Sequence, residues 1–147
     1  MQPIEHKILD LALNAARHAG DHIESRRGSG LDIDFKGRVN LVTSMDTESE
    51  EMIVSAVSHA FPDHGVVAEE GGGRDSDSAW TWVIDPLDGT TNYAHGLAVY
   101  AVSIGVLYHG SPRVAVVHAP ALAETFHAVT GQGAFRNHEP IRVTERS

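Results

Sequence analysis

The chain has 147 residues and a formal net charge of −9, with 41% hydrophobic residues, 21% charged residues and no cysteine. About 150 residues can bury roughly two thirds of the unfolded chain's surface, so one globular domain with a real core is expected without disulfides. The acidic balance argues against a nucleic-acid or anionic-membrane partner, because both need a basic face. The N-terminus lacks the layout of a signal peptide, and the longest mostly apolar stretch, residues 96–108, is too short for a membrane-spanning helix. A soluble, cytoplasmic protein is therefore expected.

The first predicted element is an amphipathic helix. Apolar residues from Ile4 to Ile23 recur at steps of three or four, and the helix is expected to end near residues 28–30. Residues 31–35 alternate apolar and acidic side chains, as in a strand. Lys36-Gly37-Arg38 is typical of a turn or mobile loop.

A second helix is predicted to begin at Thr47. Thr47 and Glu50 have the spacing of a capping box, and an apolar face follows until Phe61-Pro62. Glu48, Glu50 and Glu51 would then form the solvated face and the favourable N-terminal charge of this helix, with no part in ligand binding.

The rest of the chain consists of short β-rich runs separated by turns. The candidate strands are Gly65–Ala68, Trp80–Ile84, Ala98–Tyr108, Arg113–His118, Glu124–Val129 and Ile141–Thr144. The glycine-rich loop at residues 71–78 is expected to be exposed and mobile. Two helices followed by such runs predict an α+β fold, with the N-terminal helices packed on a mainly antiparallel sheet.

The densest chemical signal is the segment WVIDPLDGTTN at residues 82–92. An apolar strand leads into Asp85, and Pro86 prevents simple continuation of the ladder, so a turn would present the carboxylates of Asp85 and Asp88. Gly89 lets backbone amides approach a ligand, and the two threonines that follow suit the start of a helix that favours an anion. Two carboxylates would repel a phosphate unless cations lay between them, and oxygen ligands of this kind suit Mg²⁺ or Mn²⁺. The alternative is a surface turn with an Asx cap.

In this context the sequence resembles the inositol monophosphatase family, which comprises lithium-sensitive, metal-dependent sugar phosphatases related to fructose-1,6-bisphosphatase. Residues 82–93 match the family's first signature almost letter for letter, a far more specific signal than a lone glycine pattern. Residues 40–46 (NLVTSMD), 67–70 (VAEE) and 131–137 (GQGAFRN) resemble three further family segments in the same order. The resemblance covers nearly the whole chain and implies a layered helix and sheet sandwich of the sugar-phosphatase type.

The resemblance also implies a set of metal ligands. Glu69 and Asp85 would hold a first Mg²⁺ together with the backbone carbonyl of Leu87. Asp85 would bridge to a second Mg²⁺ that Asp88 also holds. Mn²⁺ is a possible substitute, and Li⁺ is expected to inhibit.

The same resemblance implies catalytic and substrate-binding roles. The hydroxyl of Thr90, supported by Asp46, would orient and help deprotonate the attacking water, and Glu69 would act with them. The amides of Gly89 and Thr90 would take the phosphate, beside Leu87 and Asp88. Lys36 occupies the place of a basic residue that the family has on a mobile active-site loop.

The sequence departs from the family in three respects. Asn40 replaces an acidic residue, which weakens any loosely held additional metal, and Ala68 replaces a glycine. The family is about twice as long as this chain, and its second half carries a Trp-Asp-x-Ala-Ala-Gly motif whose Asp completes the second metal site. Residues 1–147 are therefore expected to be the N-terminal portion of an inositol monophosphatase-like domain, without its C-terminal half.

The expected activity is Mg²⁺-dependent hydrolysis of a small polyol or sugar phosphate monoester, with myo-inositol 1-phosphate as the leading substrate. Two alternatives stay open: a fructose-1,6-bisphosphatase, and a catalytically incomplete half-domain that binds metal or assembles with another chain. A homodimer is expected by family. His18 and His22 have the helical spacing of some zinc sites, but solvated or helix-terminal histidines are favoured, and His95 is expected on a helix surface.

Overall fold

Two long helices come first in the chain, and a seven-stranded sheet follows them. The computed structural model describes residues 1–27 and 35–145. The elements in chain order are α1 (Pro3–Arg27), α2 (Phe35–Ala60), β1 (Gly65–Ala68), β2 (Trp80–Asp88), α3 (Thr90–Ala94), β3 (Ala101–Tyr108), β4 (Ser111–Ala119), the 3₁₀ helix η2 (Pro120–Leu122), β5 (Glu124–Val129), β6 (Gly133–Arg136) and β7 (Glu139–Ile141).

Helix α1 confirms the first predicted element and ends at Arg27, directly before the expected stop at residues 28–30. Pro3 occupies the first turn, where its missing N–H costs no hydrogen bond. The predicted face is buried, with Ile8, Ala19 and Ile23 fully inaccessible to solvent. The small residues between them let the helix approach the sheet closely. The alternating pattern at residues 31–34 lies outside the described residues.

Helix α2 contradicts two predictions. It begins at Phe35, so Lys36-Gly37-Arg38 is helical rather than a turn, and Thr47 lies inside the helix rather than at its N-cap. The β-branched residues of its first half are weak helix formers, and tertiary packing overrides that preference. Met45 from this half is completely buried in the core, and the Thr43 hydroxyl donates to the carbonyl of Val39 one turn back (3.0 Å).

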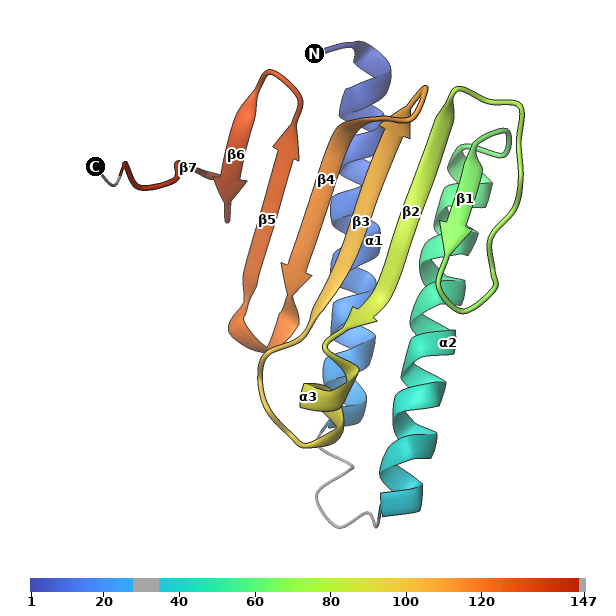
Figure 1. Cartoon of the computed structure of the whole chain (residues 1–147), viewed down its shortest axis with the longest axis vertical. Helices are drawn as coiled ribbons and strands as arrows, with labels where there is room; N and C mark the ends of the chain where they lie inside the picture. Colours follow the sequence, from blue (N-terminus) through green and yellow to red (C-terminus); the bar gives the residue numbers. More distant parts are fainter. Residues whose placement is uncertain (28–34, 146–147) are drawn as a thin grey trace.

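The strands follow one another across the sheet in the order β1 to β7. β1 and β2 are parallel, and every later neighbouring pair is antiparallel. Figure 1 shows both long helices on the same side of the sheet, where α1 packs on β3 and β4 and α2 packs on β2. The predicted α+β architecture is confirmed.

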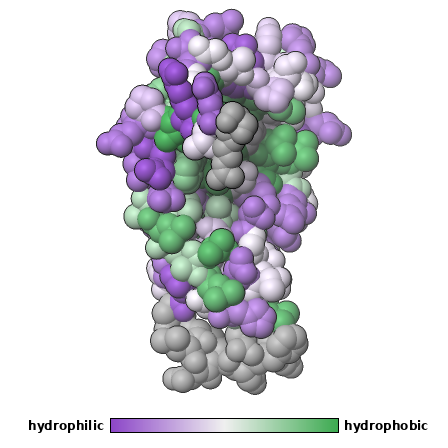
Figure 2. All heavy atoms as spheres, turned by 60° about the vertical axis from the view of Figure 1, so that its left-hand side comes forward, coloured by the Kyte–Doolittle hydropathy of each residue, from purple (hydrophilic) through white to green (hydrophobic). Residues whose placement is uncertain are grey.

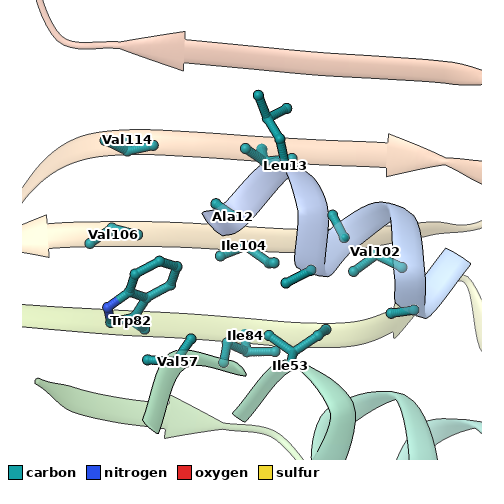
Figure 3. Close-up of a cluster of buried hydrophobic side chains, with 14 of the residues drawn as sticks. Ala12, Leu13, Ile53, Val57, Trp82, Ile84, Val102, Ile104, Val106 and Val114 are labelled. Atoms are coloured by element: carbon teal, nitrogen blue, oxygen red, sulfur yellow. The ribbon is translucent and has the colours of Figure 1, made fainter. Parts of the chain in front are cut away.

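The core lies between the sheet and the helical layer. Ile84 of β2 lies beside Ile53 of α2, and the Trp82 ring lies in the same layer between β2 and β3 (Figure 3). Every second residue of β3 and β4 is buried beneath α1, in line with the two-residue period of a strand. Each such side chain, once buried, contributes about 1.5–3 kcal/mol to folding.

Individual strands differ from their predicted bounds. β1 and β5 match, whereas β3 begins only at Ala101. The last strand, predicted at residues 141–144, is wrong: β7 ends at Ile141 after pairing with β6. The sequence also missed β6, which follows a turn in which Gly131 and Gly133 have positive φ. Short edge strands carry too few alternating residues to give a clear period.

The face of the sheet opposite the helices is exposed. Val83 and Val117 are 39% and 38% accessible, and an apolar groove of about 140 Å³ runs over β4, β5 and β6 between Ala115, Phe126 and Ala134. Figure 2, turned so that the β7 side comes forward, shows hydrophobic side chains between polar ones at this surface. In the described part of the chain, no helix is both long and apolar enough to cross a membrane.

The segment between β1 and β2 is exposed over most of its length, as expected, but Arg74 ties its middle to the body of the protein. Its guanidinium donates to the carbonyls of His64 (2.9 Å) and Phe61 (3.0 Å) and to the hydroxyl of Ser58 (2.5 Å). The backbones of Arg74 and Val66 also exchange two hydrogen bonds on the outer side of β1.

Candidate active site

The predicted site residues lie at the end of the parallel strand pair. Because β1 and β2 run in the same direction, their carboxyl ends point to the same end of the sheet. Glu69 and Glu70 follow β1 directly, while Asp85 and Asp88 belong to the last residues of β2 (Figure 1). The topology therefore brings together two segments that are 16 residues apart in the sequence.

The end of β2 differs from the prediction, because Pro86 does not stop the strand. Asp85 pairs with Ser103 and Asp88 pairs with Ala101, so two residues of β2 stand opposite one residue of β3. A proline is tolerated at such a bulge because it has no N–H to place in the ladder. The carboxylate of Asp85 accepts the N–H of Leu87 (3.3 Å), a local bond that replaces part of the ladder.

Gly89 turns the chain from β2 into α3, which begins at Thr90, where the sequence predicts a helix start. Its φ of 88° is in the left-handed region, where other residues are strained. A Cβ at this position would also lie 2.8 Å from the carbonyl oxygen of Val99. Both the backbone conformation and the lack of space for a Cβ therefore require glycine at this position. No side chain caps the helix start at Thr90.

Two tyrosines fix α3 against the C-terminal end of α1. The Tyr93 hydroxyl donates to the carbonyl of Ile23 (3.0 Å), and the Tyr100 hydroxyl donates to the carboxylate of Glu24. The two rings meet edge to face with their centroids 5.0 Å apart. Two hydrogen bonds to α1 therefore fix the part of the chain that follows Gly89.

The carboxyl groups of Asp85 and Glu69 meet at this end of the sheet. Burial, a hydrogen bond to Glu69 and the negative charges of Glu69 and Asp88 raise the pKa of Asp85 to about 6, and the bond from the Leu87 amide opposes the shift. A carboxyl group in a half-buried place next to other carboxylates keeps its proton longer. The structure thus brings Glu69, Asp85 and Asp88 into electrostatic contact.

Asp46 reaches the same region from α2. Burial and the negative charges of Glu70, Glu69, Asp85 and Glu50 raise its pKa to about 7. A pKa near neutral pH is suited to a group that takes or gives a proton. The structure brings Asp46 together with Glu69 and Asp85 although it is far from both in the sequence.

Glu50 contradicts the expectation of a solvated helical face. It is only 3% exposed, and its carboxylate accepts the N–H groups of Glu70 (2.5 Å) and Gly72 (2.7 Å). A usable signal was the four-residue spacing from Asp46 to Glu50, which continues into the buried face at Ile53. Glu51 is exposed, as predicted.

Two hollows lie beside the turn. One, of about 310 Å³, is lined by Asp88, Gly89 and Asn92 with residues at the start of β3 and in η2. The other, of about 190 Å³, lies between α2 and α3, and Thr90 lines it opposite Val42 and Thr43. Because these two α2 residues precede Asp46 by about one turn, Thr90 lies next to the stretch of α2 that carries Asp46.

The donor chemistry of the site suits a hard divalent cation. The carboxylates of Glu69, Asp85 and Asp88 and the carbonyl of Leu87 are oxygen ligands of the kind that Mg²⁺ and Mn²⁺ take. A cation would also offset the neighbouring negative charges that, after burial, raise the pKa values of Asp85 and Asp46. As the side chains stand, residues 1–27 and 35–145 contain no group of three or more His, Asp or Glu gathered closely enough to hold an ion. The assigned ligand set therefore stays a prediction.

The remaining candidates are His18 and His22 of α1, His95 after α3, and Lys36. His18 is exposed, and His22 lies 2.6 Å from the carboxylate of Glu48, so Glu48 is bonded rather than simply solvated. His95 is exposed at the C-cap of α3, as predicted. The backbone of Lys36 belongs to α2, and its side chain lies outside the described part of the structure.

The fold and the site together define an α+β protein with an acidic site and a glycine-led turn, a combination suited to binding an anion through divalent cations. The model of the inositol monophosphatase family matches residues 5–147. The chain belongs to this family, which is a family of phosphoric monoester hydrolases.

Individual relatives agree with this assignment. The chain is 42% identical over 143 residues to "Nus factor SuhB" of Vibrio cholerae, and 39% identical over 140 residues to "Fructose-1,6-bisphosphatase/inositol-1-monophosphatase" of Thermotoga maritima. These matches cover 94% and 95% of this chain and 53% and 54% of the relatives. The solved inositol monophosphatase of Anabaena superposes with a TM-score of 0.83 at 38% identity, over 97% of this chain and 51% of that one. The chain thus spans about half the length of the curated relatives it matches.

Proposed function

We propose that this chain carries the metal-binding half of a Mg²⁺-dependent phosphatase for small polyol phosphate monoesters, with myo-inositol 1-phosphate as the leading substrate. One observation carries the proposal: carboxyl groups from α2, from the turn after β1 and from β2 converge beside Gly89, where burial and their mutual repulsion raise the pKa values of Asp46 and Asp85. Family membership supports the reaction class.

Glu69, Asp85 and the carbonyl of Leu87 would hold one Mg²⁺, and Asp85 with Asp88 would hold part of a second site. When bound, the cations would neutralise phosphate charge and lower the pKa of a coordinated water. Mn²⁺ would substitute for Mg²⁺, and Li⁺ would inhibit by analogy with the family.

The chain's own groups would position the reactants. The Thr90 hydroxyl would hold the attacking water, and Asp46 would accept a proton through Thr90, a role that its raised pKa suits. The backbone amides of Gly89 and Thr90 would bind the phosphate, and the hollow beside Asp88 and Asn92 would receive part of the ester. Phosphoryl transfer depends on such positioning and charge neutralisation more than on covalent chemistry.

The test is phosphate release from myo-inositol 1-phosphate, with Mg²⁺, with chelator and with added Li⁺. We expect Mg²⁺-dependent release that falls by about 100-fold in Asp88→Asn, because a ligand of the second metal position is lost and with it part of the charge neutralisation. Asp75→Asn, in the exposed segment between the strands, is the matched control and should keep wild-type release. Equal activity in the two variants would falsify the assignment of Asp88.

Two other functions have an observation in their favour. The Thermotoga maritima relative bears the name of a fructose-1,6-bisphosphatase as well, so fructose 1,6-bisphosphate belongs in the substrate panel. The exposed apolar sheet face favours a catalytically incomplete half-domain that assembles with another chain. A folded sample that associates but releases no phosphate would favour this second reading. A cytoplasmic homodimer stays our expectation for the active protein.

A further inference from the structure

Glu50 is a buried carboxylate to which the proposed mechanism assigns no task. It lies on α2 one turn after Asp46 and is only 3% exposed. Its Oε2 accepts the N–H of Glu70 (2.5 Å), and its Oε1 accepts the N–H of Gly72 (2.7 Å). Both donors belong to the turn that follows β1.

These two bonds fix the turn to the helix. A buried carboxylate is costly unless hydrogen bonds satisfy it, and bonds from N–H groups to a charged acceptor are stronger than neutral ones. The backbone also comes very close to the helix here, because a Cβ at Gly72 would lie 2.6 Å from Oε1 of Glu50. The contact therefore depends on a carboxylate on α2 and on a residue without a side chain in the turn.

The turn fixed in this way carries Glu69. Glu69 immediately precedes Glu70, and the Glu70 amide is bound by Glu50. The carboxyl group of Glu69 is hydrogen-bonded to Asp85 on β2. Asp46 stands four residues before Glu50 on the same helix. One side chain thus connects the helix that carries Asp46 to the turn that carries Glu69.

We propose that Glu50 is a positioning residue: by holding the Glu70 and Gly72 amides, it keeps the Glu69 carboxylate beside Asp85 and thereby sets the affinity of the site for divalent cations. The inference rests on the proposed function, because Glu69 is assigned there as a metal ligand. Groups that orient metal ligands typically change metal affinity by about 10–100-fold when they are replaced.

The test compares Glu50→Gln with Glu51→Gln in the whole chain. Glu50→Gln keeps the size of the side chain but replaces one acceptor oxygen with an NH₂ group that faces an N–H donor. Glu51→Gln makes the same chemical change at the exposed neighbouring position. The two measurements are Mn²⁺ binding, followed by the paramagnetic signal of the free ion, and hydrogen exchange of the Glu70 and Gly72 amides.

We expect Glu50→Gln to weaken Mn²⁺ binding by about 10-fold or more and to speed exchange at both amides, while Glu51→Gln changes neither. Gly72→Ala should weaken Mn²⁺ binding in the same direction, because its methyl group displaces the Glu50 carboxylate from the turn. This second variant disturbs the contact from the turn and removes no carboxylate from the chain.

Different results would overturn the inference about Glu50 and the proposed function. Unchanged Mn²⁺ affinity in Glu50→Gln, with faster exchange at Glu70 and Gly72, would show that the contact is structural only and would overturn the inference. Unchanged exchange in the same variant would overturn it as well. Absence of Mn²⁺ binding by the unsubstituted chain would instead overturn the proposed function, and with it the link between Glu50 and metal affinity.

Discussion

Two groups of carboxylates in this fold, one fully buried and one partly buried, have opposite electrostatic surroundings. At the N-terminal end of α1, Glu5 is fully buried, and Arg113 of β4 donates to its carboxylate through Nε (2.7 Å) and a second guanidinium nitrogen. Burial raises the pKa of Glu5, but the amide of Gln2 and the Arg113 guanidinium outweigh it, so the pKa is lowered. At the carboxyl ends of β1 and β2, burial and neighbouring carboxylates raise the pKa values of Asp46 and Asp85.

The difference separates a structural charge from a functional one. The ion pair of Glu5 is complete within the chain, so it joins α1 to the sheet without any ligand. The acids around Asp85 repel one another, which lowers the stability of the metal-free fold and favours whatever brings positive charge. Charge repulsion that the chain itself leaves uncompensated at one place is typical of a functional site.

Arg113→Met tests the structural side and should have the largest effect. The substitution leaves the Glu5 charge buried without its guanidinium partner, so the free energy of unfolding should fall by about 3 kcal/mol in urea denaturation. Arg136→Met, at an exposed position of β6, is the control and should cost little. Adding Glu5→Gln to Arg113→Met should recover part of the loss. If Arg113→Met and Arg136→Met lowered the free energy of unfolding equally, the Glu5–Arg113 pair would not be a stabilising buried ion pair.

Addition of Mn²⁺ or Mg²⁺ tests the functional side. An ion that binds only the folded chain stabilises it by about 2.7 kcal/mol at 100 times its dissociation constant, so Tm should rise with metal concentration. Asp85→Asn should abolish this rise because Asp85 is assigned to both metal positions. If the variant responds to metal as strongly as the unsubstituted chain, the acids are not the binding site.

The pH dependence sharpens the comparison through Asp46. Its pKa is about 7 in the folded chain and 3.8 ordinarily, so the folded state binds more protons between these values. Stability from this group therefore falls as the pH rises from about 4 to about 7. In chelator at pH 8, Asp46→Asn should raise the free energy of unfolding by about 1 kcal/mol, less than the whole shift implies because the group is half-exposed.

The difference in the free energy of unfolding between Asp46→Asn and the unsubstituted chain has to be measured across the pH range. The lowered pKa values of His64 and His118, caused mainly by burial, make stability rise with pH below about 6.5, opposite to Asp46. Subtracting the two curves removes the histidine contributions. A difference that does not grow between pH 4 and pH 7 would count against the raised pKa.

His22→Gln should have the smallest effect. His22 and Glu48 join α1 to α2 at 2.6 Å, but their side chains are 29% and 42% exposed. Partly exposed pairs contribute between about zero and 1 kcal/mol, so a loss below about 0.5 kcal/mol is expected by thermal unfolding at pH 6. A loss similar to that of Arg113→Met would show that exposure does not separate the two kinds of pair.

The sequence was most informative where one period or one motif decides the structure. The three- and four-residue spacing predicts α1, the short β-rich runs at residues 65–68 and 124–129 predict β1 and β5, and the two threonines after Gly89 predict the start of α3. In each case, local preference and burial agree, so the fold adopts what the pattern indicates.

The sequence was least informative where distant contacts decide. The first half of α2 has β-branched residues and a glycine at position 37, and the core position of Met45 overrides them. Glu50 stands in a run of acidic residues, and only the approach of the turn after β1 makes it a buried acceptor. Asp46 was assigned to the candidate site only through the family resemblance of residues 40–46, because no local spacing places it close enough to Glu69 and Asp85 to raise its pKa.

The bridge between Val66 and Arg74 has a consequence for how copies of this chain can meet. An exposed strand edge is a template on which another chain can add a strand. Along β1, the outward N–H and carbonyl of Val66 already bond to Arg74. At the other edge of the sheet, the short strand β7 contains Pro140, which has no N–H to offer. Both rims of the sheet are thus poor templates for fibril growth, and association of two copies is expected to proceed face to face.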